Sequence, residues 1–192
     1  DYDITDGFEK SYSVNLEFGN YIEPWDGVDH LNLHVLYTHG DQLSESDFKF
    51  SLDQISVDAH IPFSSEIGFN TKFFYGQVSG EEVGAQHKYY IGGNGTVRGY
   101  DFKYNNGDQL TSLTLRAVRG NISLFYECGY IGSGEDLALD FIKELFADNA
   151  ITSVGFSYDF WESFRLDVVK PLNRLDGDDS FRFNLIIHSM QL

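Results

Sequence analysis

The stretch YYIGGNGTVRGYDF, residues 89–102, holds four glycines and a single cation, Arg98, between flanking aromatic residues. The chain around it has 192 residues and a formal net charge of −17, so one arginine in this setting needs an explanation. Glycine permits positive φ angles and close approach of the backbone, which makes the stretch a bendable loop. From these residues alone, Arg98 is either an exposed turn residue or a side chain folded back into the protein.

Alternation of apolar and polar residues dominates the chain and predicts β-strands. Ten segments show this period of two, and the connections between them are rich in Gly, Asp, Asn and Ser. Within one segment the apolar phase changes between Leu52 and Ile55, which predicts a β-bulge or a break there. The segments are about 10–22, 27–38, 46–62, 66–78, 83–91, 108–118, 121–131, 152–160, 163–171 and 180–191.

The stretch GEDLALDFIKELFADNA, residues 134–150, interrupts the strand pattern. Its apolar residues recur at helical spacing, and Ser133 is a suitable N-cap with acidic residues in the first turn. We expect a short amphipathic helix inside a loop, which either packs on the rim of a barrel or docks on a membrane surface or a partner. The apolar positions are Leu137, Phe141, Ile142, Leu145 and Phe146.

Composition narrows the classes of function. Aromatic residues make up 16% of the chain, with 17 Phe and 12 Tyr, and aromatic girdles at a membrane interface explain such an excess. Thirty acidic against thirteen basic side chains argue against a nucleic-acid partner, because phosphate binding needs a basic face. The single cysteine, Cys128, excludes an intrachain disulfide and a cysteine-based zinc site. No apolar run approaches the roughly 18 residues of a transmembrane helix.

Two architectures fit these strands. A soluble sandwich or small barrel turns its apolar faces inward, whereas a transmembrane barrel turns them outward to lipid. The apolar faces here are heavily aromatic, and the polar faces carry small residues such as Ser153 and Gly155 that suit a crowded lumen. The pattern therefore favours a single all-β domain over residues 1–192. We expect an antiparallel up-and-down transmembrane β-barrel of about ten strands, with eight or twelve as the other strand numbers.

GGNGTVRGY, residues 92–100, and FYECGYIG, residues 125–132, are two of four stretches that match known motifs. The first resembles the VRGF/VRGY signature, and the second the F-x-D/E-x-G strand, of the bacterial surface-antigen family, which includes BamA, TamA and the two-partner-secretion transporters. ITSVGFSYDFWESFRLDVVKPL, residues 151–172, resembles its hairpin near the C-terminus, and GNYIEPWDGVDHLNL, residues 19–33, resembles a hairpin in its mid-barrel. The matches occur in the family's order over nearly the whole chain and align it with the last ten strands of the family's barrel.

The resemblance implies an outer-membrane barrel whose loop folds back into the lumen and places its arginine against an acidic side chain. Here these residues are Arg98 and Glu127, and alternation independently puts Glu127 on the polar face of its strand. Glu127 as a solvated lumen carboxylate without a partner is the alternative. The expected loop-locking residues are Arg98, Glu127, Gly99, Tyr100, Val97, Gly93, Phe125 and Gly129.

A second group of charged residues occupies polar faces of neighbouring segments, which predicts a charge network in the lumen rather than a catalytic dyad. We find no nucleophile elbow, P-loop or dinucleotide fingerprint, and the six histidines lack metal-ligand spacing. We therefore expect neither an enzyme nor a cofactor or metal site. The lumen-network residues are Arg116, Asp159, Arg165 and Asp167.

Two functions remain open at this point. A barrel-only family member without POTRA domains would aid the insertion or export of other membrane proteins. A passive narrow pore, cation-preferring because of the acidic balance, would keep the family fold alone. The expected partners are the lipid bilayer, client membrane proteins and a second copy of the chain, and the expected location is the bacterial outer membrane. The sequence departs from the family in TLR, residues 114–116, where the family often has E-L-R, and in the final HSMQL, which lacks a terminal aromatic.

Overall fold

The computed structural model describes residues 11–21, 32–42, 50–80, 83–132, 143, 145, 147–160, 164–173 and 180–187. For the first two of these ranges it describes the backbone only. Helical segments of the length and hydropathy needed to span a bilayer are absent from the described part of the chain.

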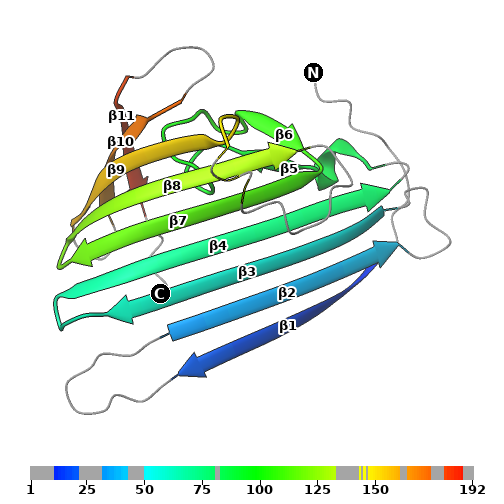
Figure 1. The fold of residues 1–192 in the computed structure, drawn as a ribbon, viewed down its shortest axis with the longest axis horizontal. Coiled ribbons are helices and arrows are strands. Elements are labelled where there is room, and N and C mark those ends of the chain that lie inside the picture. The colour runs from blue at the N-terminus through cyan, green and yellow to red at the C-terminus, as the bar shows by residue number, and fades with distance from the viewer. Residues whose placement is uncertain are drawn as a thin grey trace.

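Nine strands form one antiparallel sheet in which each strand pairs with its neighbours in the chain (Figure 1). This up-and-down order confirms the all-β antiparallel expectation. Among the described residues no pairing joins the first strand to the last. The strands are β1 (Ser11–Tyr21), β2 (Asn32–Gln42), β3 (Phe50–Pro62), β4 (Ile67–Gly80), β7 (Gln109–Arg119), β8 (Ile122–Gly132), β9 (Ile151–Phe160), β10 (Phe164–Pro171) and β11 (Arg182–Ile187).

The prediction of a sheet strand at 83–91 is wrong. This segment forms a 3₁₀ turn, η1 (Ala85–His87), and a short strand, β5 (Tyr89–Ile91), which pairs with β6 (Asn105–Gly107) in a separate two-stranded sheet. Its apolar side chains pack inside the molecule instead of facing outward, since Ile91 is buried in a cluster with Leu110 and Ile151. The segment between β5 and β6, residues 92–104, is called the Arg98 loop below.

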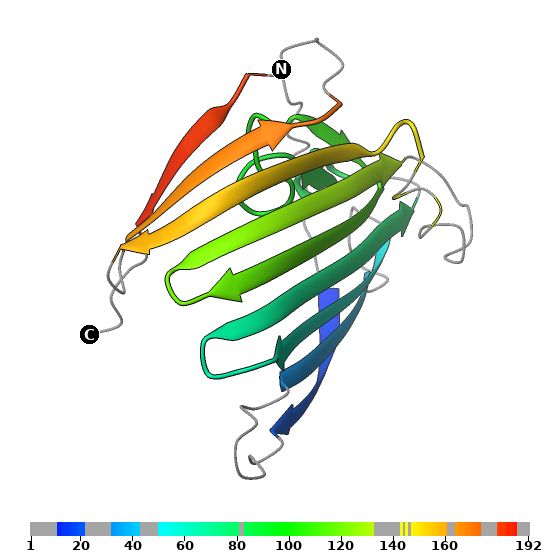
Figure 2. The same cartoon turned by 60° about the vertical axis from the view of Figure 1, so that its left-hand side comes forward.

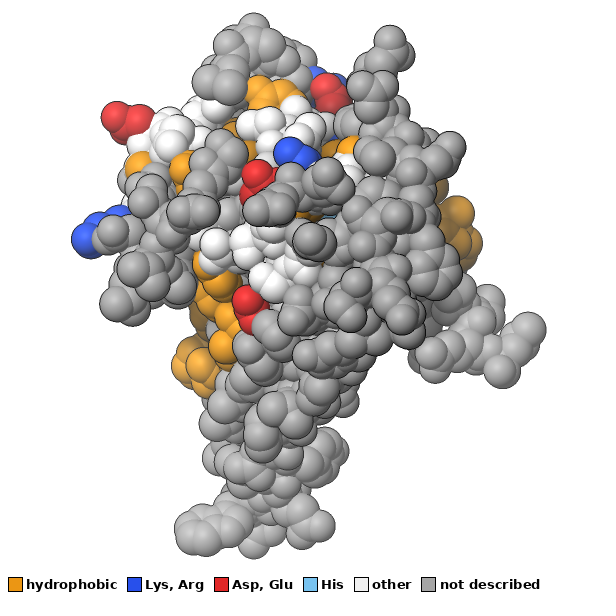
Figure 3. Space-filling view, turned by 90° about the vertical axis from the view of Figure 1, so that its right-hand side faces the viewer, with side chains coloured by type: hydrophobic (Ala, Val, Ile, Leu, Met, Phe, Trp, Pro, Cys, Tyr) orange, Lys and Arg blue, Asp and Glu red, His pale blue; other side chains and the backbone are white. Residues whose placement is uncertain are grey.

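The burial of the sheet is inverted relative to a soluble protein. Large apolar side chains are exposed on one face, with Leu124 at 61%, Phe183 at 71% and Leu185 at 64% exposure. On the opposite face, polar side chains such as Ser153 and Ser157 are fully buried. Because alternate residues of a strand point to opposite faces, this distribution fits an apolar outer face and a polar inner one. Figure 3, which views the molecule from the end that carries the Arg98 loop, shows hydrophobic side chains along its flanks and charged ones scattered over that end.

The predicted bulge near Leu52 and Ile55 is also wrong. The pairing of β3 with β2 and with β4 runs in unbroken register through both residues. The apolar phase changes because the two ends of β3 bury different faces. Near Phe50 the inner face packs in an apolar cluster with Val78, Leu52 and Tyr89, whereas farther along the apolar residues lie on the outer face.

The Arg98 loop lies on the concave side of the curved sheet, behind β8 and β9 in Figure 2. An apolar cluster holds it there, formed by Ile91, Val97, Tyr100, Leu110 and Ile151. The inner face of the sheet is thus apolar where the Arg98 loop covers it and in the separate cluster around Phe50 and Val78. The helix expected at 134–150 falls mostly outside the described residues, although Leu145 from its apolar side is 2% exposed.

Candidate functional site

Glycine conformations turn the Arg98 loop back into the sheet. Gly92 has a φ of +106°, and a Cβ atom there would lie 2.3 Å from the carbonyl oxygen of Asp101. Gly99 has a φ of +89°, and its Cβ would lie 3.0 Å from Val169 on β10. Only glycine combines this φ range with so close an approach. The turn is closed by the N–H of Gly92, which donates to Thr96 Oγ1 at 2.8 Å, and that of Gly93, which donates to the Tyr100 carbonyl at 3.2 Å.

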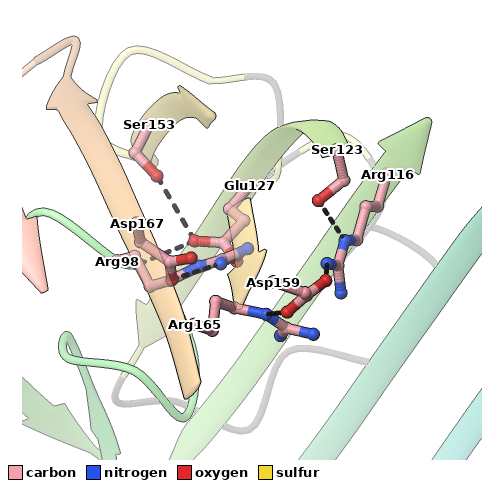
Figure 4. Close-up of polar contacts among 8 residues, drawn as sticks. All are labelled: Arg98, Arg116, Ser123, Glu127, Ser153, Asp159, Arg165 and Asp167. Carbon is pink, nitrogen blue, oxygen red and sulfur yellow. Dashed lines mark hydrogen bonds and ion pairs between the residues drawn. The ribbon is translucent and has the colours of Figure 1, made fainter. Parts of the chain in front are cut away.

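Arg98 is held by two carboxylates from the sheet (Figure 4). Its backbone N–H donates to Glu127 Oε2 at 2.7 Å, and its Nε and Nη2 lie 2.8 Å and 2.6 Å from Glu127 Oε1. Its Nη1 donates to Asp167 Oδ2 at 2.7 Å. The guanidinium carbon lies 3.4 Å from the centroid of the Phe125 ring, a cation–π contact. We call Arg98, Glu127 and Asp167 the buried triad.

The buried triad is almost sealed from solvent, with exposures of 6% for Arg98, 3% for Glu127 and 0% for Asp167. Burial by itself lowers the pKa of Arg98, but the hydrogen bonds and charges of Glu127 and Asp167 outweigh it, so the pKa is raised. The guanidinium therefore stays charged. Since one cation faces two carboxylates, losing that cation would leave buried negative charge without compensation.

Small residues in the sheet make room for the loop. A Cβ atom on Gly155 would lie 2.1 Å from Phe125 Cζ, so the tip of the ring comes close to the β9 backbone. A Cβ atom on Gly129 would lie 2.6 Å from Ile91 and 3.0 Å from Val97. Gly155 thus leaves space for the Phe125 ring, which Arg98 covers. Gly129 leaves space for the apolar side chains of Ile91 and Val97.

Replacing Gly155 with alanine should push Phe125 out from beneath Arg98. We expect a loss of about 1–3 kcal/mol in the free energy of unfolding, the usual cost of overpacking. Urea denaturation followed by tryptophan fluorescence measures this change. Gly95→Ala is the matched control, since no atom lies within 4 Å of its Cβ position. Equal stability of the two variants would contradict the packing described.

Three of the four predicted lumen-network residues meet in the structure. Arg165 Nε lies 2.6 Å from Asp159 Oδ1, and Arg116 Nη2 lies 3.4 Å from Asp159 Oδ2. Arg116 Nε also donates to Ser123 Oγ at 2.7 Å. The fourth residue, Asp167, contacts Arg98, whose Nη1 lies 2.7 Å from its Oδ2. Alternation gives the face on which Asp167 lies but not its height relative to the Arg98 loop.

Neutralising Asp159 should leave Arg116 and Arg165 side by side without their shared carboxylate. We expect Asp159→Asn to lower the free energy of unfolding by about 1–2 kcal/mol, because both guanidinium groups lose a charged partner. The control is Asp101→Asn, which removes a more exposed carboxylate 3.8 Å from Arg182 and should cost under about 1 kcal/mol. Urea midpoints give both values, and an Asp159 effect no larger than the control would refute the network.

One residue that holds the loop was missed by the sequence reasoning. Asn173, which follows β10, has its Oδ1 2.9 Å from the Tyr100 hydroxyl, and it accepts from the Thr152 N–H at 2.8 Å. The Tyr100 hydroxyl also lies 3.0 Å from the Thr152 carbonyl oxygen. Asn173 therefore ties the loop to the start of β9. Its position outside every alternating segment gave no signal of this contact.

The described residues offer no group of three or more His, Cys, Asp or Glu side chains placed to hold a metal ion. Cys128 is buried, and His60 Nδ1 is hydrogen-bonded to Asn70 Oδ1. The chemistry that the buried triad supports is ionic attachment of a loop to the inner face of a sheet.

The fold is similar to that of BamA. The crystal structure of BamA from Haemophilus ducreyi lacking POTRA domains 1–3 superposes with a TM-score of 0.69 at 15% sequence identity. The match covers 93% of this chain and 42% of that chain, so the present chain spans less than half of the BamA structure. At this identity the likeness shows the fold alone. No family model matches the sequence, and no curated protein matches it.

Proposed function

We propose that this chain is an outer-membrane β-barrel of the bacterial surface-antigen family that aids the insertion or export of other membrane proteins. Under this proposal its partners are the lipid bilayer, client membrane proteins and a second copy of the chain. The buried triad is the observation that carries the proposal, because it joins a VRGY loop to the inner face of a sheet with the BamA-like fold.

The sheet has the dimensions and surface of a membrane-spanning wall. A transmembrane β-strand needs about 9–11 residues, and β3, β4, β7, β8 and β9 have 13, 14, 11, 11 and 10. Its outer face exposes large aliphatic and aromatic side chains, which water disfavours and lipid accepts. These features support insertion into a bilayer.

We propose that the buried triad fixes the Arg98 loop in one position. Desolvation offsets much of the attraction in a buried ion pair, so such a pair is a poor source of net stability. Its geometric demand is strict, however, because five donor–acceptor contacts must form together. The fifth contact comes from Ser153, whose Oγ lies 3.4 Å from Glu127 Oε2. A loop held this way narrows the lumen. It stays fixed while the rest of the barrel assists the insertion or export of a client protein.

The test is folding of a client barrel in liposomes that contain the purified full chain. Urea-unfolded client is diluted into the liposomes, and its folding is followed by the gel shift that distinguishes folded from heat-denatured barrels. The proposal predicts folding at least several-fold faster than in empty liposomes. Liposomes with an unrelated barrel at the same density are the control, and an equal rate in both would overturn the proposal.

A passive pore is the second candidate, favoured by the acidic balance of the chain, 30 acidic against 13 basic side chains. Planar-bilayer recordings separate the two functions. Steady cation-selective current without faster client folding would assign the pore, whereas client acceleration without steady current assigns the assembly role.

A further inference from the structure

A second polar site lies on the inner face of the sheet, away from the buried triad. A cavity of about 480 Å³ opens there over β3, β4 and β7. Each of these three strands contributes two inward-facing polar side chains to its wall. The six are Asp58, His60, Asn70, Lys72, Thr114 and Arg116.

Strand register arranges these side chains in two rows across the sheet. In the first row Asp58 pairs with Lys72, which pairs with Thr114. In the second, His60 pairs with Asn70, which pairs with Arg116. Lys72 and Arg116 are therefore diagonal neighbours on adjacent strands, with Cα atoms about 7–8 Å apart. Both side chains lie on the inner face, and both line the cavity.

The cationic side chains at the cavity share few carboxylates among the described residues. Lys72 Nζ lies 3.9 Å from Asp58 Oδ1, a loose contact, and the Lys72 side chain is 60% exposed. Arg116 and Arg165 share one carboxylate, Asp159, which Arg165 holds at the shorter distance. Within the described part of the chain, the cavity and the side chains in contact with it thus hold three cations and two carboxylates.

We propose that this cavity binds a small oxyanion, a phosphate or a carboxylate, between Lys72 and Arg116. Arg116 Nε and Nη2 contact Ser123 and Asp159, so its Nη1 supplies the donor toward the anion, and Lys72 supplies a point charge beside it. The Thr114 hydroxyl and the Asn70 amide are further donor groups in the wall. His60 Nδ1 donates to Asn70 Oδ1, and the His60 ring packs over Gly68. The site goes beyond the proposed function and depends only on the fold.

Calorimetric titration of the purified full chain in detergent with inorganic phosphate tests the site. Sodium chloride at equal ionic strength removes non-specific screening effects. We expect saturable binding that Lys72→Gln weakens about tenfold, since one charge-assisted contact is lost. Arg116→Gln should weaken it at least as much, and Asp58→Asn should tighten it by removing a competing carboxylate. Lys88→Gln is the matched control, because this lysine pairs with Asp108 outside the cavity.

Absence of saturable phosphate binding, or binding that Lys72→Gln leaves unchanged, overturns the proposal. Because Lys72 is exposed, its variant should fold even if Arg116→Gln does not. Parallel titrations with acetate and with short-chain phosphatidic acid identify the source of the anion. Comparable affinity for free phosphate and for the lipid assigns a soluble anion, and clearly tighter lipid binding assigns a headgroup. Client folding is measured separately, so failure of one proposal does not imply failure of the other.

Discussion

Replacing Arg98 with alanine should release the Arg98 loop from the inner face of the sheet. The change leaves Glu127 and Asp167 buried without a cation, and breaking a buried ion pair in this way typically costs about 3–5 kcal/mol. The Phe125 ring also loses the guanidinium that covers it. The apolar contacts of Val97 and Tyr100 oppose release but cannot satisfy the two carboxylates.

Limited proteolysis and hydrogen exchange over residues 92–104 measure this release. We expect cleavage in the loop and loss of amide protection in Arg98→Ala, with β7 and β8 still protected. Lys103→Ala is the matched control, because it removes a cation from an exposed position of the same loop. Protection of the loop at the level of the unaltered protein would show that the triad does not hold it.

Removing the Glu127 carboxylate should destabilise the protein about as much as removing Arg98, because it leaves a buried cation without one of its two carboxylates. Glu127→Ala leaves the Arg98 backbone N–H and two guanidinium nitrogens without an acceptor in a buried site. We expect a loss of about 3–5 kcal/mol in the free energy of unfolding. The Arg98→Ala/Glu127→Ala double variant should be more stable than the sum of the single losses predicts, by about 2–3 kcal/mol.

A double-mutant cycle from urea denaturation gives this coupling energy. The same cycle on Lys88 and Asp108, a more exposed pair 3.4 Å apart, is the control and should give under about 1 kcal/mol. A coupling for Arg98 and Glu127 as small as that of the control would mean that their contacts do not depend on each other.

The strands could be predicted from the sequence because alternation has a short, local period. Eight of the nine sheet strands lie largely within segments predicted from it, and β2 is shifted by four to five residues. Local pattern does not show which face meets lipid, since a soluble sandwich alternates in the same way. Apolar and polar residues alternate in the segment at 83–91 too. It lies outside the nine-stranded sheet because it packs against Leu110 and Ile151, which local pattern does not show.

The site could be predicted in part for the same reason. Alternation places Glu127 and Asp167 on the inner face, and the glycines around Arg98 permit a loop that folds back. The contact between Arg98 and Asp167 depends on the stagger of β10 against β8 through β9, which no local pattern encodes. Asn173 was missed because its role depends on where a turn brings it.

Under the proposed function, apolar side chains of this sheet face lipid and polar ones face an enclosed lumen. Spin labels on single cysteines, introduced in a Cys128→Ser background and reconstituted in liposomes, test it most directly. Labels at Leu124 and Leu185 should be relaxed mainly by oxygen dissolved in the bilayer, and labels at Thr114 and Asn184 mainly by a water-soluble nickel complex. Equal accessibility at all four positions, or the reverse pattern, would contradict the account.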